Sequence, residues 1–191
     1  MNIYICGVGG QGIGMLSETL IRAADYAGLP VTGVDTHGLA QRGGQVSSHL
    51  KTETNNVSPL VMKKDADLVI GLERHEAGRG MNEYLKFGGT LLYYDTVRQP
   101  LPVRLGQTEI IENSQLQEES ARRGIRLIAV PEDLDLPDPV MQNTILLAEI
   151  AGRDLISGIK PEHCLTALAD LLPNALFEKN RDLFDNCLKL I

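Results

Sequence analysis

The sequence predicts an α/β fold: a Rossmann-like three-layer sandwich with a mostly parallel sheet, helices on both faces and a helical C-terminal end. Short apolar runs alternate with amphipathic stretches along most of the chain, which is the pattern of parallel β/α units. The C-terminal part shows helical periodicity without further strands. Since no internal repeat or linker interrupts the 191 residues, we expect a single domain that covers residues 1–191.

A glycine-rich turn joins the first predicted strand to the first predicted helix. The apolar run 3–6 forms the strand, and residues 13–27 form the helix, which Gly28 ends. The turn fits G-x-G-x-x-G, the fingerprint of a nucleotide-binding unit, through Gly7, Gly9 and Gly12. Such a turn presents backbone N–H groups and a helix dipole to an anion, although glycines there also serve tight helix–sheet packing.

The second predicted strand leads into an unusual polar loop. Residues 31–34 form the strand, and Asp35 follows it, where the acid of a dinucleotide-binding unit would hold the ribose hydroxyls. Residues 36–45 then carry a histidine, an arginine and paired glycines instead of another strand or helix. An arginine followed by two glycines can bind one anion, or it can form a surface turn with a solvated guanidinium.

The remaining elements continue the α/β rhythm. We expect a half-exposed strand at 46–51 with a structural His49. Buried strands at 68–72 and 90–94 are joined by a helix at 73–86 and a turn at 87–89. A charged helix at 115–123 and a strand at 125–130 follow. Asp138 and Pro139 predict the start of a helix with Val140 on its inner face. Helices at 161–171 and 174–190 end the chain, and the apolar stripe of the last is either core or a docking face for a partner.

Composition excludes several classes of protein. A net charge of −7 argues against a general nucleic-acid binder, and the lack of tryptophan argues against a base-stacking platform. Because no apolar run approaches the length of a membrane span and the N-terminus does not resemble a signal peptide, we expect a cytoplasmic protein without membrane contact. The three cysteines and four histidines are scattered along the chain, which argues against a metal site and against a self-contained iron–sulfur cluster.

No catalytic constellation is recognisable in the sequence. The G-x-S-x-G elbow of hydrolases, the P-loop and H-E-x-x-H are all missing. The sequence therefore predicts a binding surface without catalytic residues, which indicates a subunit of a larger enzyme.

Two motifs in order resemble a known family. Residues 7–12 (Gly-Val-Gly-Gly-Gln-Gly) and 36–44 (Thr-His-Gly-Leu-Ala-Gln-Arg-Gly-Gly) resemble the gamma subunit or domain of the 2-oxoacid:ferredoxin oxidoreductases, whose members act on pyruvate, 2-ketoisovalerate or indolepyruvate. The pair looks most similar to the beta subunit of indolepyruvate:ferredoxin oxidoreductase. The segments 66–73 and 85–90 and the helix from Asn143 to Gly152 also look like family features, so the resemblance covers essentially the whole chain.

The resemblance implies a non-catalytic, gamma-type subunit of a thiamine-diphosphate-dependent enzyme. The complex would oxidatively decarboxylate a 2-oxoacid to acyl-CoA and pass the electrons to ferredoxin, an indirect partner of this chain. Thiamine diphosphate and the iron–sulfur clusters would reside in partner subunits, so the isolated chain would be inactive, while coenzyme A would be contacted by this chain. The implied binding residues are Gly7, Gly9, Gly10, Gln11 and Gly12 in the first loop and His37, Gln41, Arg42, Gly43 and Gly44 in the second.

Several alternatives stay open at this point. The two loops could contact coenzyme A or a partner chain, and Arg42 could hold a phosphate or a carboxylate. A free-standing NAD(P)-dependent oxidoreductase would use the first loop and Asp35, although the second loop lies just past that residue; a nucleotide-binding scaffold would use the first loop alone. A homodimer of the isolated chain and the identity of the oxoacid are also undecided.

Overall fold

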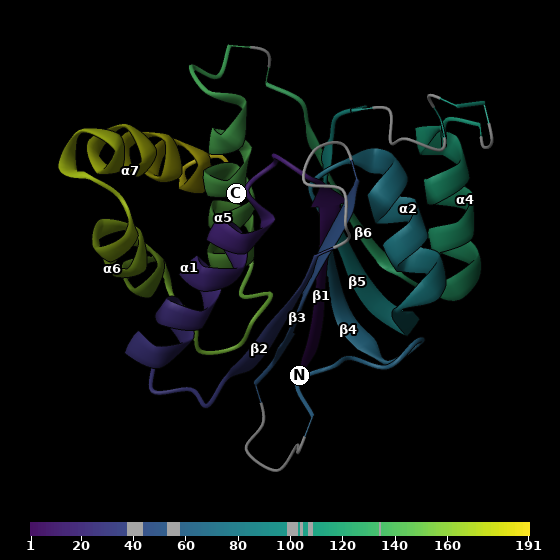
Figure 1. The fold of residues 1–191 in the computed structure, drawn as a ribbon, viewed down its shortest axis with the longest axis horizontal. Coiled ribbons are helices and arrows are strands. Elements are labelled where there is room, and N and C mark those ends of the chain that lie inside the picture. The colour runs from purple at the N-terminus through teal and green to yellow at the C-terminus, as the bar shows by residue number, and fades with distance from the viewer. Residues whose placement is uncertain (38–43, 53–57, 99–102, 104, 107–108, 134) are drawn as a thin grey trace.

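Among the described residues, the chain forms a six-stranded sheet with helices on both faces, as a computed structural model shows (Figure 1). The structure describes residues 1–37 (only the backbone of His37), 44–52, 58–98, 103, 105–106, 109–133 and 135–191. The predicted α/β fold, with its mostly parallel sheet and helical C-terminal end, is confirmed. That the whole chain is one domain stays a prediction.

The strand order of the sheet is β2-β3-β1-β4-β5-β6. The strands are β1 (Asn2–Val8), β2 (Thr32–His37), β3 (Gln45–Lys51), β4 (Ala66–Gly71), β5 (Leu85–Asp95) and β6 (Arg126–Pro131). β1, β4, β5 and β6 are parallel, whereas β3 is antiparallel to both of its neighbours, β1 and β2. The carboxyl ends of the parallel strands therefore meet at one edge, at the top of Figure 1, where open α/β sheets bind their ligands.

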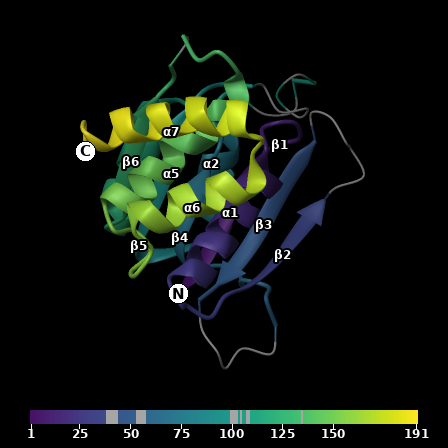
Figure 2. The same ribbon diagram turned by 90° about the vertical axis from the view of Figure 1, so that its left-hand side faces the viewer.

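The helices form two layers around the sheet (Figure 1). One face carries α1 (Ile13–Tyr26), α5 (Gln142–Gly152), α6 (Pro161–Leu171) and α7 (Asn174–Leu188). The other face carries α2 (Arg74–Glu83) and α4 (Asn113–Arg123). Figure 2 shows the first layer in front of the sheet, with β2 and β3 extending beyond it at one edge.

Alternating side chains of β1 pack into two hydrophobic cores, one on each face of the sheet. Ile3 and Ile5 pack in the core beneath α1 and α5, and Tyr4 and Cys6 pack in the core beneath α2. All four side chains are buried, because β1 lies inside the sheet and helices cover both of its faces. β1 therefore leads from the buried centre of the sheet directly to the glycine turn.

The predicted ends of several helices are confirmed. α1 spans nearly the range expected for it, and Gly28 follows its cap with a positive φ of 68°. α6 begins and ends at the predicted residues 161 and 171. The Asp138 carboxylate accepts a hydrogen bond of 2.9 Å from the backbone N–H of Val140, which starts a 3₁₀ turn (Pro139–Met141) that leads into α5.

The expectation of a half-exposed strand at 46–51 is wrong. β3 lies between β1 and β2, and its residues from Ser47 to Lys51 are buried. Their polar groups have partners inside the fold: Ser48 Oγ donates to Asp35 at 2.6 Å, and His49 Nδ1 accepts from the N–H of Val61 at 3.1 Å. Paired polar side chains can be buried, so alternation of polar residues did not indicate solvent here. The structural role expected of His49 is confirmed.

Two further expectations differ from the structure. The predicted turn at 87–89 lies inside β5, because α2 ends early at Glu83 and the strand begins at Leu85. The strand is irregular at these residues, since β5 pairs with β4 at Leu85 and again from Thr90, and Gly88 has a positive φ of 70°. Val140 does not belong to the inner face of α5, since it precedes the helix and is 37% exposed. Among the described residues, no helix is long and apolar enough to span a membrane.

Candidate functional site

The first glycine turn leaves the carboxyl end of β1 and runs directly into α1. Its neighbours are the end of β4, at Leu72, and the start of α5. These segments lie far apart in the sequence, and the parallel sheet brings them to one edge of the molecule (Figure 1). This edge is the candidate functional site.

The glycines of this turn differ in why the structure requires glycine at each position. A Cβ on Gly7 would come within 2.9 Å of Gln11 Oε1 and 3.0 Å of Leu72 Cβ, so the residue must be glycine for packing. Gly12 is the N-cap of α1 with φ 78°, and a Cβ there would come within 2.6 Å of Asn143 Nδ2. Gly10 has φ 102°, but a Cβ there would meet no described atom within 4 Å. The turn is therefore packed at Gly7 and Gly12 and open at Gly10.

Gln11 holds this turn against the sheet. Its side chain is buried, and its Oε1 accepts a hydrogen bond of 2.7 Å from the N–H of Val8. Its Nε2 donates a hydrogen bond of 2.8 Å to the carbonyl of Leu72, at the end of β4. Both ends of the amide thus have intramolecular partners, and Gln11 fixes the shape of the loop. A contact with a ligand, as the resemblance implies for Gln11, is not tested by this geometry.

The start of α5 closes the other side of the turn. Asn143 Nδ2 donates to the carbonyls of Gln11 and Gly12 at 3.1 and 3.0 Å. Gln142 Nε2 donates at 3.3 Å to the same Leu72 carbonyl that Gln11 uses. Gln142 Oε1 and Asn143 Oδ1 are buried without a hydrogen-bond partner among the residues that the structure describes. Two acceptor atoms therefore remain unsatisfied beside the glycine turn.

A pocket of about 270 Å³ opens between the turn and α5; we call it the loop pocket. It is lined by Val8, Gly9, Gly10, Gln11, Arg98, Pro139, Val140 and Gln142. Its walls combine apolar side chains with exposed glycine backbone and two amide side chains. Arg98 is exposed and is the charged side chain in this lining, so the pocket combines an apolar wall, a cation and an unsatisfied acceptor.

The second predicted loop lies mostly outside the described residues. Gln41, Arg42 and Gly43 belong to that part, and the side chain of His37 is likewise not described. The ends of the predicted loop belong to strands, since Thr36 and His37 are the last residues of β2 and Gln45 is the first of β3. The carbonyl of Gly44, just before β3, accepts a hydrogen bond of 2.8 Å from the N–H of Gly9. The ends of the two loops therefore lie side by side. The binding roles expected of these residues stay predictions.

Asp35 does not take the position that a dinucleotide-binding unit requires. In that unit the strand carrying the acid lies next to β1, whereas here β3 separates β2 from β1. The Asp35 carboxylate accepts from Ser48 Oγ at 2.6 Å, and its other oxygen is 3.5 Å from the place of a Cβ on Gly14. Asp35 thus lies along the side of α1, and this arrangement disfavours the NAD(P)-dependent alternative.

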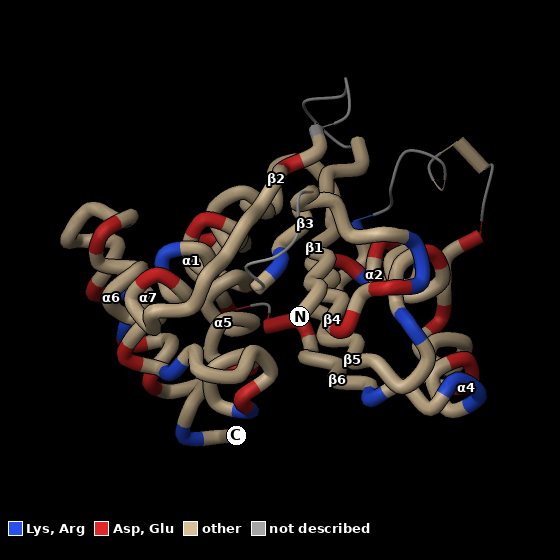
Figure 3. Tube along the Cα trace, turned by 90° about the horizontal axis from the view of Figure 1, so that it is seen from below, with Lys and Arg blue, Asp and Glu red and all other residues tan. Residues whose placement is uncertain are grey.

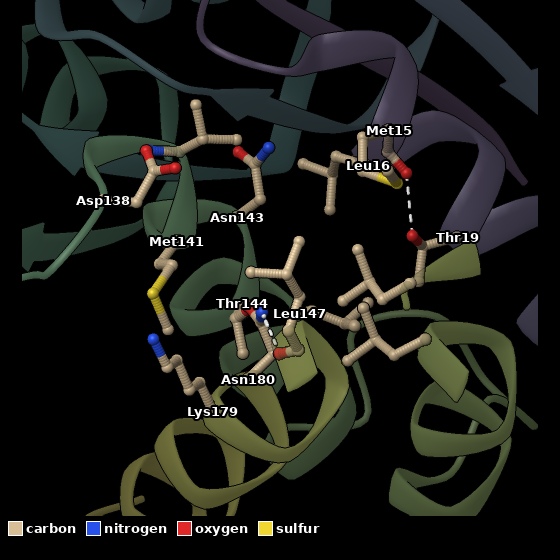
Figure 4. Close-up of a pocket in the computed structure, with 14 residues that line it drawn as sticks. Met15, Leu16, Thr19, Asp138, Met141, Asn143, Thr144, Leu147, Lys179 and Asn180 are labelled. Carbon is tan, nitrogen blue, oxygen red and sulfur yellow. Dashed lines mark hydrogen bonds between the residues drawn. The ribbon is translucent and has the colours of Figure 1, made fainter. Parts of the chain in front are cut away.

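A second cavity, of about 250 Å³, lies among α1, α5, α6 and α7 (Figure 4); we call it the helix groove. Its lining is mostly apolar and includes Leu16 and Leu147. Its polar groups satisfy one another in part, since Thr144 Oγ1 donates to Asn180 Oδ1 at 2.5 Å. Val140 lines both the helix groove and the loop pocket, so the two cavities are neighbours.

Charged residues near the site have structural partners. Asp95, at the end of β5, accepts from Arg74 Nε at 2.6 Å and from Asn113 Nδ2 at 2.5 Å. Glu73 caps α2 by accepting from the N–H of Glu76 at 2.8 Å, and burial raises the pKa of its carboxyl group while that N–H opposes the rise. Acidic and basic residues are interspersed over both helical layers in Figure 3.

The cysteine nearest to the glycine turn, Cys6, is not a reactive thiol. Cys6 is fully buried, its Sγ donates to the carbonyl of Glu76 at 3.2 Å, and burial raises the pKa of the thiol well above its usual range. Such a thiol stays protonated and is not a cluster ligand. Within the described ranges, no group of histidine, cysteine, aspartate and glutamate residues has the arrangement of a metal site.

Sequence reasoning missed Arg98, Gln142 and Asn143 as site residues. Arg98 follows β5 in a segment without a motif, and Asn143 lies 131 positions from the Gly12 carbonyl that it binds. The available signal was the predicted helix start at Asp138, because a helix that begins at the carboxyl edge of a parallel sheet places its first residues near the glycine turn.

Comparison with known proteins places this geometry in context. A family model described as "Pyruvate ferredoxin/flavodoxin oxidoreductase" matches residues 2–190. The chain is 45% identical over 87 residues to indolepyruvate oxidoreductase subunit IorB of Archaeoglobus fulgidus, which covers 46% of this chain and 41% of that protein. It is 36% identical over 105 residues to the protein of the same name from Thermococcus kodakarensis, covering 55% and 52%. The matches thus span about half of these relatives or less.

Solved structures share the fold at lower identity. The gamma subunit of keto/oxoacid ferredoxin oxidoreductase from Geobacter sulfurreducens matches with a TM-score of 0.65 at 20% identity, over 98% of this chain and 96% of that one. The 2-oxoglutarate:ferredoxin oxidoreductase from Magnetococcus marinus, solved with 2-oxoglutarate, coenzyme A and succinyl-CoA bound, matches with a TM-score of 0.64 at 15% identity, over 100% of this chain and 31% of that one. At these identities the likeness shows the fold alone.

Proposed function

This chain belongs to the pyruvate ferredoxin/flavodoxin oxidoreductase family, and from that membership we propose that it is the gamma-type, non-catalytic subunit of a 2-oxoacid:ferredoxin oxidoreductase. The complex oxidatively decarboxylates a 2-oxoacid on thiamine diphosphate, forms an acyl-CoA and transfers the electrons to ferredoxin. The observation that carries this proposal is the family match over residues 2–190. The relatives named indolepyruvate oxidoreductase subunit IorB make indolepyruvate the first substrate to test.

The second part of the proposal is that this chain contacts coenzyme A at the loop pocket. The open backbone at Gly10 and the exposed Arg98 offer donors to an anion such as a diphosphate. The apolar wall at Val8, Pro139 and Val140 suits the hydrocarbon part of such a ligand. A protein of this fold was solved with coenzyme A bound, which supports the choice of ligand without assigning the site.

Thiamine diphosphate and iron–sulfur clusters belong to partner subunits in this proposal. Cluster iron requires several thiolates at one place, but Cys6 and Cys164 are buried in different hydrophobic cores and Cys187 lies on α7. The cysteines of this chain therefore do not fit a cluster. Its own residues bind and orient coenzyme A and dock onto the catalytic chains.

Purification from the native source tests the assignment to a complex. The tagged chain should co-purify with a protein that contains thiamine diphosphate and iron–sulfur clusters, identified by mass spectrometry and cofactor analysis. A chain that is recovered alone, under conditions that keep such complexes intact, contradicts the proposal. Clear binding of NAD(H) by the isolated chain in calorimetry would instead favour the free-standing oxidoreductase.

A further inference from the structure

Two glutamines that line the loop pocket donate to the same backbone carbonyl, but only one of their side-chain oxygens has a hydrogen-bond donor among the described residues. Gln11 and Gln142 both donate to the Leu72 carbonyl, at 2.8 and 3.3 Å. Gln11 Oε1 accepts from the N–H of Val8, whereas Gln142 Oε1 has no donor in the described part of the chain. Gln142 is 1% exposed and is one of the residues that line the loop pocket, so this pocket is the space beside its side chain.

A buried amide oxygen without a donor is unfavourable, and native proteins rarely leave one. The Leu72 carbonyl already has a donor in Gln11, so the carbonyl does not require Gln142. A hydrophobic side chain of similar length would fill the same volume without leaving an unsatisfied acceptor. The Gln142 amide is therefore better explained by a partner that enters the pocket.

We propose that Gln142 is a specificity-determining residue of the loop pocket, whose Oε1 accepts a hydrogen bond from an amide N–H of the bound ligand. This inference rests on the proposed function, and it states which part of coenzyme A the pocket holds. The amide-bearing pantetheine arm lies beside Gln142, and the phosphates lie at the mouth, near Gly10 and Arg98.

The charge distribution of the pocket supports this orientation. A phosphate oxygen beside Gln142 Oε1 would place two acceptors together in a buried setting, which is unfavourable. The cation of the lining, Arg98, is exposed at the mouth, where a phosphate can also remain partly hydrated. Val8, Pro139 and Val140 provide apolar contact for the hydrocarbon parts of the arm.

Ligand fragments separate the two halves of this site. Calorimetry on the chain purified with its partner subunits would compare coenzyme A, pantetheine and inorganic pyrophosphate as ligands of wild type, Gln142→Met and Arg98→Met. We expect Gln142→Met to weaken coenzyme A and pantetheine about three- to tenfold, the effect of one hydrogen bond, and to change pyrophosphate affinity less than about twofold. Arg98→Met should weaken coenzyme A and pyrophosphate but leave pantetheine unchanged.

A ligand-side comparison covers the case in which Gln142→Met does not fold. On the wild-type complex, pantetheine N-methylated at its amides should bind about three- to tenfold more weakly than pantetheine. Equal affinity of the two compounds, or an unchanged coenzyme A affinity of Gln142→Met, overturns the inference, because the amide oxygen is then satisfied by a structural water. Equal weakening of pyrophosphate and pantetheine overturns it as well. A wild-type complex that binds no coenzyme A overturns both the inference and the proposed ligand.

Discussion

The two sides of the first glycine turn obey different constraints. At Gly7 and Gly12 the surrounding atoms leave no room for a Cβ, whereas at Gly10 the space beyond the backbone is open. The packed side is held by Gln11 and Asn143, and the open side faces the loop pocket. A fingerprint that is usually attributed to phosphate binding thus serves packing at Gly7 and Gly12, and the open side at Gly10 is the part that we propose for the ligand.

Gly12→Ala tests the packed side and should have the largest effect. A methyl group would come within 2.6 Å of Asn143 Nδ2 and 2.9 Å of Val140 Cγ1, in a backbone conformation with φ 78°. Overpacking and the left-handed conformation together should lower the free energy of unfolding by about 3–4 kcal/mol. Urea unfolding measures this, and a loss below about 1 kcal/mol would show that α5 moves aside and that the turn is not tightly packed.

Gln11→Met should have the next largest effect. It removes the acceptor for the N–H of Val8, which stays buried, and we expect a loss of about 2 kcal/mol in the free energy of unfolding. The matched control is Gln142→Met, which removes an unsatisfied oxygen and should be neutral or slightly stabilising in the absence of ligand. Equal destabilisation by both substitutions would abolish the distinction between the two amides.

Gly10→Ala tests the open side and should be milder. The new methyl group meets no described atom within 4 Å, so only the positive φ of 102° opposes it, at about 1 kcal/mol. Because Gly10 lines the loop pocket, coenzyme A affinity should fall more than stability does. A stability loss as large as that of Gly12→Ala would mean that the two sides are not different.

The smallest effect on stability is expected from a substitution of Glu73, the N-cap of α2. Because burial raises the pKa of its carboxyl group, the folded state binds the proton more tightly, and stability falls as the pH rises from the ordinary glutamate range through this raised value. Glu73→Gln keeps the cap on α2 and removes that loss, so the stability of the variant relative to wild type should rise as the pH increases from about 4 to about 7. Urea unfolding at both pH values checks this, with Glu118→Gln on the exposed face of α4 as the control for charge removal. Parallel pH dependences of Glu73→Gln and wild type would contradict it.

Local patterns predicted the fold well, and long-range contacts explain what they missed. The strand, glycine turn and helix at the N-terminus depend on neighbouring residues, so periodicity and capping rules were sufficient. β3 was misjudged because its polar side chains bind Asp35 and the backbone of Val61, which no local pattern reveals. The turn expected at 87–89 is an irregular part of β5, which pairs with β4 at Leu85 and again from Thr90, and the positive φ of Gly88 belongs to this irregularity.

The binding roles of the two loops stay predictions, and the side chains of α5 beside the first loop were not predicted. Motif spacing identified both loops, and the hydrogen bond between Gly9 and Gly44 brings their ends together. Gln142 and Asn143 reach the turn only through the packing of α5, more than a hundred residues away in the chain. Which residues touch a ligand therefore depends on tertiary structure that the motifs do not encode.

Reconstitution of the enzyme tests the central claim most directly. The rate of 2-oxoacid-dependent and coenzyme A-dependent reduction of ferredoxin would be measured with the purified chain, with its co-purified partner freed of this chain, and with both together, using indolepyruvate first. The account predicts no activity for this chain alone, and acyl-CoA formation that requires both components. Turnover by the isolated chain, or a partner whose coenzyme A-dependent rate does not change when this chain is added, would contradict it.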